Sequence, residues 1–164
     1  MKKYPVVIGR FEHVDVVDKL DGVPAKIDTG AYRSAIHACD IQLIDKKSKK
    51  YLKFTVGNHP SFGRKRTIQT SSFTEIEVMS SSCHKTKRYE VSLKIRLGYK
   101  IFQTSFTLAD RTHHVFPVLI GRKAIRSRFL VDVTRSGVNR NELRAAAREL
   151  IKRGDEEYLE ELEK

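Results

Sequence analysis

Short runs of β-branched and aromatic residues, separated by turn residues, occupy most of the first 120 positions. In the clearest run Val91, Leu93 and Ile95 alternate with polar residues, which is the two-residue period of a half-buried strand. The other runs are PVVIGRFEHVDVV, VPAKIDTG, YLKFTV, FTEIEVM, KIFQTSFTLAD and FPVLIG. The pattern predicts a mainly β protein whose sheet is closed or nearly closed.

Turn residues predict how neighbouring runs connect. Asp21-Gly22 is a hairpin signal between the first two runs, and Leu97-Gly98-Tyr99-Lys100 is a second one. Two polar, basic segments, GNHPSFGRKR and SSSCHKTKR, have the composition of loops.

A helical pattern occurs only near the C-terminus, in NRNELRAAARELIKRG. Its apolar residues fall on one face, Asn139 or Asn141 is a suitable N-cap, and Gly154 a suitable end. A second, acidic helical segment is predicted from Asp155. We therefore expect a β-barrel domain over residues 1–135 and a helical tail over 136–164. The tail could pack on its own barrel or on a dimer partner.

Composition limits the class of protein. A chain of 164 residues with 40% hydrophobic residues can bury one hydrophobic core without stabilisation by disulfides or metal ions. The sequence has no apolar stretch as long as a membrane span, and the N-terminal apolar part is too short for a signal peptide. Cys39 and Cys83 are the only cysteines, so no disulfide framework is implied. These features predict a cytoplasmic protein without a membrane partner.

The charge predicts an anionic partner. The sequence has 32 Lys and Arg against 20 Asp and Glu, a net charge of +12, although its last ten residues are mostly acidic. Such a surface attracts polyanions. Nucleic acid and acidic peptide both meet this requirement, and charge alone does not choose between them.

Two motifs stand at the ends of apolar runs. The first, AKIDTGAYRSAIHA, places Asp28-Thr29-Gly30 directly after a predicted strand, and the second, TLADRTHHVFPVLIGR, ends in Gly121-Arg122. Asp-Thr-Gly alone can be an ordinary turn, since Asp and Thr bond their own backbone and Gly accepts positive φ.

Together the two motifs resemble the retropepsin-like aspartic proteases, over roughly residues 5–133. The chain is similar to the bacterial and archaeal family with the older name of ATP-dependent zinc proteases. That family is related to a protein that trims glutamate tails from a ribosomal protein and is often linked to a glutamate ligase. The resemblance implies a retropepsin-like closed β-barrel and a cytoplasmic aspartic peptidase that cleaves acidic, poly-glutamate peptide tails.

The resemblance also implies roles for the motif residues. A homodimer would bring one Asp28 from each subunit together as the catalytic pair. The Gly30 amide would bond to the carboxylate, and Thr29 would bond to its mate across the two-fold axis. Gly121 and Arg122 would brace the loop from behind.

The sequence departs from the viral pattern just after Asp-Thr-Gly-Ala. Viral retropepsins have an acidic residue there, which pairs with the arginine of Gly-Arg, whereas this chain has Tyr32 and Arg33. Arg122 thus lacks its expected partner, and Arg33 adds positive charge near Asp28. We interpret this as a site for acidic peptide, such as a glutamylated ribosomal protein. The predicted substrate-binding residues are Ala31, Arg33, Arg88, Arg111 and Arg122. The arginine fork suits carboxylates, although the arginines other than Arg33 could equally be solvated surface residues.

The sequence does not support the older family name. It has no His-Glu-x-x-His, and its Cys83-His84 and His113-His114 pairs lack the spacing of zinc sites. It also has no phosphate loop ending in Gly-Lys-Ser or Gly-Lys-Thr. We therefore expect no metal, ATP or other cofactor, and we expect His37 to be a packed residue.

Two alternatives stay open. The protein could be a non-catalytic basic β-barrel that binds RNA or the ribosome, although interleaved aromatics typical of RNA-recognition motifs are missing. It could also keep the retropepsin fold as a binding module for acidic tails. The intact Asp28-Thr29-Gly30 favours catalysis, and direct nucleic-acid binding is the less favoured partner.

Overall fold

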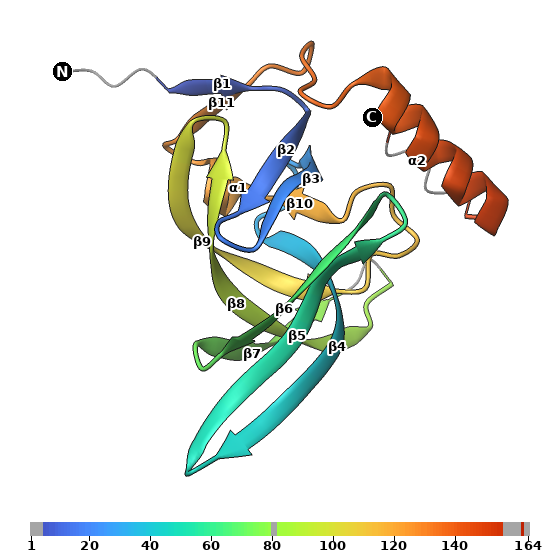
Figure 1. Cartoon of the computed structure of the whole chain (residues 1–164). Coiled ribbons are helices and arrows are strands. Elements are labelled where there is room, and N and C mark those ends of the chain that lie inside the picture. Colours follow the sequence, from blue (N-terminus) through green and yellow to red (C-terminus); the bar gives the residue numbers. More distant parts are fainter. Residues whose placement is uncertain (1–4, 80–81, 156–161, 163–164) are drawn as a thin grey trace.

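A computed structural model describes residues 5–79, 82–155 and 162 of the chain (Figure 1). The described part is mainly β, as predicted. Its elements in chain order are β1 (Val6–Ile8), β2 (Phe11–Val16), β3 (Leu20–Ile27), β4 (Ser34–Lys46), β5 (Lys49–His59), β6 (Phe62–Thr70), β7 (Phe73–Met79), β8 (Lys85–Leu97), β9 (Lys100–Ala109), β10 (Val118–Ile120), α1 (Arg122–Ile125), β11 (Phe129–Val131) and α2 (Arg140–Arg153).

Six strands close into a barrel. Their order is β10-β3-β2-β8-β9-β4, and β10 pairs again with β4, which completes the ring. Strand positions that alternate along β2 and β8 point inward, so that Val14, Val16, Ile95 and Leu97 are all buried. The closed sheet predicted from the sequence is confirmed.

The short strand β10 determines where the Asp-Thr-Gly and Gly-Arg motifs meet. It lies parallel to β3 and antiparallel to β4, with Ile120 paired to Ile27. The backbone amide of Asp28 then donates to the carbonyl of Ile120 over 2.9 Å. The residues that follow β3 and those that follow β10 are therefore neighbours, although more than ninety positions separate them in the sequence.

Strands β4 and β5 continue beyond the barrel as a projecting hairpin, and β6 pairs with the inner part of β5; we call this antiparallel sheet the arm (Figure 1). The expectation of a loop over 57–66 was wrong, because most of this segment belongs to β5 and β6. Its turn lies at Pro60-Ser61, between the paired residues His59 and Phe62. The outer edge strand of the arm is β6. Most of its side chains are exposed to solvent, so its composition resembles that of a loop.

The two predicted hairpin turns differ in outcome. Residues 98–99 connect β8 to β9 as expected, with Gly98 at a φ of 58°. The β2–β3 turn, however, lies at residues 17–19, before Asp21-Gly22. Asp18 takes the positive φ there, at 62°. Gly22 lies inside β3, where its amide donates to Asp15 Oδ1 over 2.7 Å.

Helix α2 packs on its own barrel. Asn139 caps its first turn by accepting the Glu142 amide, and Gly154 ends it in the left-handed conformation. Ala146 and Leu150 are buried against a second apolar cluster that includes Phe11. The second predicted helical segment, from Asp155, falls largely outside the described residues. No helix in the described part of the chain has the length and apolar character needed to cross a bilayer.

Candidate active site

The Asp28 carboxylate is held by its own loop. Its Oδ1 accepts hydrogen bonds from the backbone amides of Gly30 at 2.9 Å and Ala31 at 3.2 Å. Amide donors to a carboxylate oxygen fix its orientation. Asp28 is half-buried, while Thr29 and Gly30 are exposed. The carboxylate thus has a fixed orientation in a loop that is accessible from outside the barrel.

Arg122 braces this loop from behind. Its backbone amide donates to the carbonyl of Ala31 over 2.8 Å. Its Nη1 donates to the carbonyls of Thr29 and Gly30 over 3.0 and 2.9 Å. Backbone carbonyls therefore take the place of the carboxylate partner that Arg122 lacks in this sequence. This is the bracing position implied by the resemblance.

Gly121 allows the two segments to approach closely. A Cβ at this position would lie 2.5 Å from the carbonyl oxygen of Arg33 and 2.8 Å from that of Tyr32. The Gly121 amide also donates to Ser34 Oγ over 3.0 Å. Any larger residue would push α1 away from the loop that carries Asp28.

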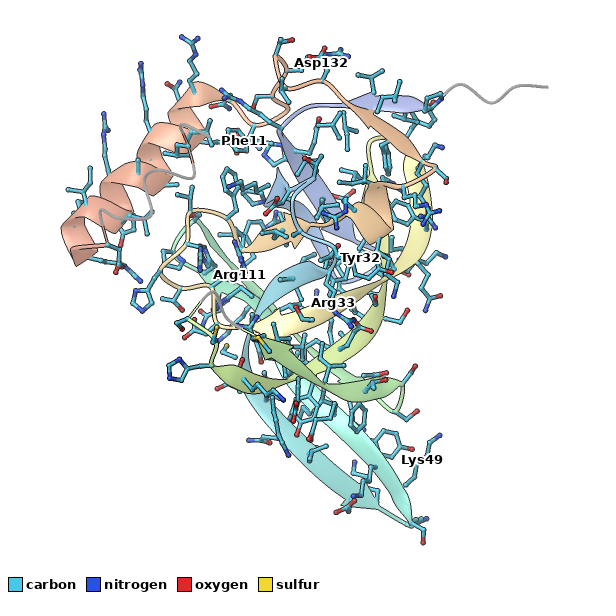
Figure 2. The ribbon with its side chains drawn as sticks, turned by 180° about the vertical axis from the view of Figure 1, so that it is seen from behind. Phe11, Tyr32, Arg33, Lys49, Arg111 and Asp132 are labelled. Atoms are coloured by element: carbon cyan, nitrogen blue, oxygen red, sulfur yellow. The ribbon has the colours of Figure 1, made fainter. Side chains whose placement is uncertain are left out.

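Arg33 is paired with an acidic residue of β8. Its Nη1 lies 2.7 Å from Glu90 Oε2, and 46% of its side chain is exposed. Figure 2 shows Arg33 near Tyr32, which itself is exposed. The ion pair connects the loop after Asp28 with the base of the β7–β8 hairpin.

Arg88 belongs to the same side of the β7–β8 hairpin as Glu90. The two residues are two positions apart on β8, so their side chains point to the same face of the strand. Arg88 is half-buried and faces Ile76 across the hairpin. Because Glu90 contacts Arg33, this face of the hairpin is the one directed toward the Asp28 loop.

Two hollows flank the Asp28 loop. One, of about 450 Å³, is lined by Arg10, Lys26, Ile27, Asp28, Thr29, Val131 and Val133. The other, of about 400 Å³, is lined by Thr29, Tyr32, Arg122, Lys123, Ile125 and Arg126. Asp28 is the one acidic residue among these described lining residues, and five are cationic. The surroundings of the carboxylate therefore favour an anionic ligand.

Arg111 does not join this group. Only 7% of it is exposed, its Nε donates to the carbonyl of Phe116 over 2.9 Å, and its amide donates to His37 Nδ1 over 2.9 Å (Figure 2). It lies in a buried cluster with His37 and His59, whose rings meet edge to face with centroids 5.2 Å apart. The buried Arg111 side chain therefore supports the 110–117 loop. The prediction that His37 is packed is confirmed.

Burial also governs the charge of the two histidines. It lowers the pKa of His59 to about 4 and lowers the pKa of His37 as well. His59 Nε2 lies 2.7 Å from the carbonyl of Arg111. Both imidazoles are therefore neutral at pH 7. The cationic neighbour of both rings in the core is Arg111.

The remaining histidines and cysteines are dispersed. Across residues 5–79, 82–155 and 162, no three His, Cys, Asp or Glu side chains are grouped so as to hold a metal ion. His113 contacts Asp155 over 2.9 Å, and Cys83 is exposed in the β7–β8 connection.

Sequence reasoning missed four cationic residues of the hollows, namely Arg10, Lys26, Lys123 and Arg126. Lys123 follows the Gly-Arg motif directly, so its position in the sequence was a usable signal. Arg10 and Lys26 are distant in the sequence and share no motif. They meet because β2 and β3 run antiparallel, with Phe11 opposite Lys26.

The comparisons agree with the fold and the motif. The family model described as "Retropepsin-like aspartic endopeptidase RimB" matches residues 7–142. A crystal structure of the Legionella pneumophila protein Lpg0085, titled as having unknown function, superposes with a TM-score of 0.68 at 29% identity. It covers 81% of this chain and 97% of that one.

Curated relatives carry a different name. A "Probable alpha-L-glutamate ligase" from Desulfotalea psychrophila is 28% identical over 69% of this chain, and one from Shewanella halifaxensis is 30% identical over 70%. The match spans about a quarter of each relative, 25% and 26%. The family match itself covers most of the chain and includes both motifs. The chain therefore belongs to the RimB-like family of retropepsin-like aspartic endopeptidases.

Proposed function

We propose that this protein is an aspartic peptidase that cleaves acidic, glutamate-rich peptide tails. The observation that supports this most directly is the setting of Asp28. Two backbone amides orient its carboxylate, and the hollows on both sides of it are lined by arginine and lysine. A carboxylate is suited to activate water, and the cations are suited to bind a substrate with many carboxylates.

The chemistry requires two carboxylates that share one proton. The ionised carboxylate takes a proton from water as that water attacks the scissile carbonyl carbon. The protonated carboxyl gives its proton to the carbonyl oxygen. Collapse of the tetrahedral intermediate breaks the C–N bond, and a proton passes to the leaving amine.

A homodimer would supply the second carboxylate. Thr29 is exposed beside Asp28, as a residue that bonds across a two-fold axis has to be. Exposed apolar side chains also lie on β1, on β11 and just after β11: Val7 is exposed by 45%, Leu130 by 57% and Val133, which lines a hollow with Asp28, by 71%. Covering them is favourable at about 25 cal/mol per Å² of apolar surface. In the proposed dimer each subunit contributes Asp28 and one half of the substrate cleft.

The proposed substrate class rests on charge and on the relatives. Arg33, Arg88, Arg122 and the neighbouring lysines favour carboxylate side chains over apolar ones. The relatives' name refers to a ligase acting with α-L-glutamate, and an enzyme that removes glutamates would oppose such a ligase. A glutamylated ribosomal protein in the cytoplasm fits this proposal.

The test is mass spectrometry of a peptide that ends in six glutamates, incubated with the wild type, Asp28→Asn and Asp18→Asn. Asp18 is an exposed turn residue at positive φ, which asparagine also tolerates, so this variant is the matched control. We expect loss of glutamates with the wild type and Asp18→Asn, and none with Asp28→Asn.

Other outcomes lead to other functions. Cleavage by all three proteins would show that Asp28 is only a turn residue. Absence of cleavage, combined with binding of the hexaglutamate peptide by the wild type, would identify a binding module for acidic tails.

A further inference from the structure

The arm presents an outer sheet face that the proposed peptidase chemistry does not use. Antiparallel partners share a face, so Lys46 lies with Lys49, Ile44 with Tyr51, and Gln42 with Lys53. On the other side of β5 the same face continues through Thr55 with Thr67 and Gly57 with Lys65. We call this the lysine face, defined by Lys46, Lys49, Lys53, Lys65 and Tyr51.

The opposite face of the arm is the one that packs on the protein. It carries Leu52, Phe54 and Ile68, which are buried in the main core. Arg64 and Arg66 on that side donate to backbone carbonyls of the β2–β3 turn region, at Asp21 and Lys19. The lysine face therefore points away from the barrel.

The lysine face is predominantly cationic. Its four lysines are exposed, and none of them forms an ion pair within the described ranges. Asp45 belongs to the opposite face. Asp40 lies in the β4 bulge, and its Oδ2 is 3.6 Å from the Sγ of Cys39, which pairs with Thr55 on this face, so one carboxylate borders the four lysines. Lysines whose charge is not neutralised locally favour a polyanion.

An aromatic ring lies among these lysines. Tyr51 is half-buried at the middle of the face, and Lys49 Nζ lies 5.7 Å from its ring centroid. Along β5, Lys49, Tyr51 and Lys53 follow at alternate positions, about 7 Å apart. A base can stack on such a ring while the cations on either side meet phosphates. The carboxylates of an acidic peptide would bind the lysines without needing an aromatic ring.

Uncharged hydrogen-bonding side chains complete the face. Gln42 and Gln69 lie on either side of Lys53 and are exposed. Thr67 is exposed too, although its hydroxyl lies 3.2 Å from that of the buried Thr55. Amide and hydroxyl groups can bond to base edges and to a ribose 2′-hydroxyl, which distinguishes RNA from DNA.

We infer that the lysine face of the arm binds single-stranded RNA. The phosphates lie along the lysines and one base stacks on Tyr51. At its Lys49 end the face is separate from the site around Asp28, since Lys49 lies far from Tyr32 and Arg33 in Figure 2. The inference does not depend on the proposed peptidase function.

The test is fluorescence anisotropy of a labelled twelve-residue oligouridylate with the full chain. We expect log Kd to rise with log salt with a slope of about 3, which corresponds to four phosphate contacts on a single strand. Lys49→Gln/Lys53→Gln should weaken binding at least tenfold at low salt and lower the slope by about 1.4. Lys94→Gln/Lys152→Gln removes two exposed lysines elsewhere and is the matched control.

Tyr51→Leu separates stacking from charge. It keeps an apolar group at the half-buried position, so we expect about fivefold or greater loss of affinity with an unchanged salt slope. Asp28→Asn should bind the oligonucleotide like the wild type, which keeps this test independent of the active site.

Several results would overturn the inference. One is equal weakening by the two lysine pairs, which would mean a general field effect. Another is binding of duplex RNA or of oligothymidylate as tight as that of oligouridylate. A third is displacement of the oligonucleotide by hexaglutamate at lower concentrations than by unlabelled RNA, which would assign the face to acidic peptides.

Discussion

At the scale of single residues, the contact between Gly121 and the Asp28 loop should be intolerant of any side chain. We expect Gly121→Ala to lower the free energy of unfolding by about 2–3 kcal/mol, because its Cβ would overlap backbone atoms that cannot rotate away. Gly63→Ala is the control, since a Cβ there meets nothing within 4 Å. Chemical denaturation measures both. Equal stability of the two variants would mean that α1 can shift without cost.

The Arg33–Glu90 ion pair competes with an acidic substrate in the proposed site. Glu90→Gln removes the charge that holds Arg33, so we expect hexaglutamate to bind several-fold more tightly. The Asp28→Asn background permits measurement by calorimetry without turnover. Glu77→Gln, which loses the 3.7 Å contact to Lys85 on the same hairpin, is the control. A weaker affinity in Glu90→Gln would show instead that Glu90 positions Arg33 for substrate.

The buried His59 should make stability depend on pH. Its pKa is about 4 in the folded protein and 6.5 when unperturbed, so the unfolded chain binds more protons between these values. The free energy of unfolding therefore falls as pH decreases from about 6.5 to 4, by about 3 kcal/mol from this group. His59→Gln should remove that part of the slope in urea titrations at each pH. His13→Gln, at a half-exposed position, should keep it.

At the scale of elements, α2 is docked through a few apolar side chains. Leu150 is 1% exposed and Ile151 is 48% exposed, so Leu150→Ala should cost about 2–4 kcal/mol of stability and Ile151→Ala much less. Thermal unfolding followed by circular dichroism distinguishes them. An effect of Leu150→Ala that changes with protein concentration would indicate that the helix packs on a partner subunit instead.

The elements also show what the sequence could and could not predict. Alternation identified β8, and the cap and stop residues identified α2. Strand β4 was harder to predict from the sequence, because a bulge between Cys39 and Gln42 interrupts its two-residue period. At the candidate site, the two motifs predicted that Asp28 and Arg122 belong together, and Arg122 does contact the loop that follows Asp28. The cations Arg10 and Lys26 could not be found from sequence, because their convergence follows from strand pairing, and the burial of Arg111 follows from tertiary packing.

At the scale of the whole molecule, the exposed apolar face of β1 and β11 leads to a prediction about assembly. β1 and β11 pair in parallel, with Val7 opposite Leu130, so these two side chains share the outward face while Val6 and Phe129 point inward. In the proposed dimer this face is covered by its symmetry mate. A charge placed there would be buried without a partner, which is strongly unfavourable.

Leu130→Glu should therefore shift the protein from dimer to monomer and abolish cleavage of hexaglutamate, although Asp28 and its hydrogen bonds are unchanged. Leu43→Glu, at a leucine exposed by 52% on the arm, should leave assembly and activity intact. Sedimentation equilibrium gives the mass, and rate against protein concentration gives the order of the active species. In the wild type, activity should rise with the square of concentration below the dimer dissociation constant. A linear dependence with full activity in Leu130→Glu would mean that one subunit holds a complete site, and the second carboxylate would have to be sought within the same chain.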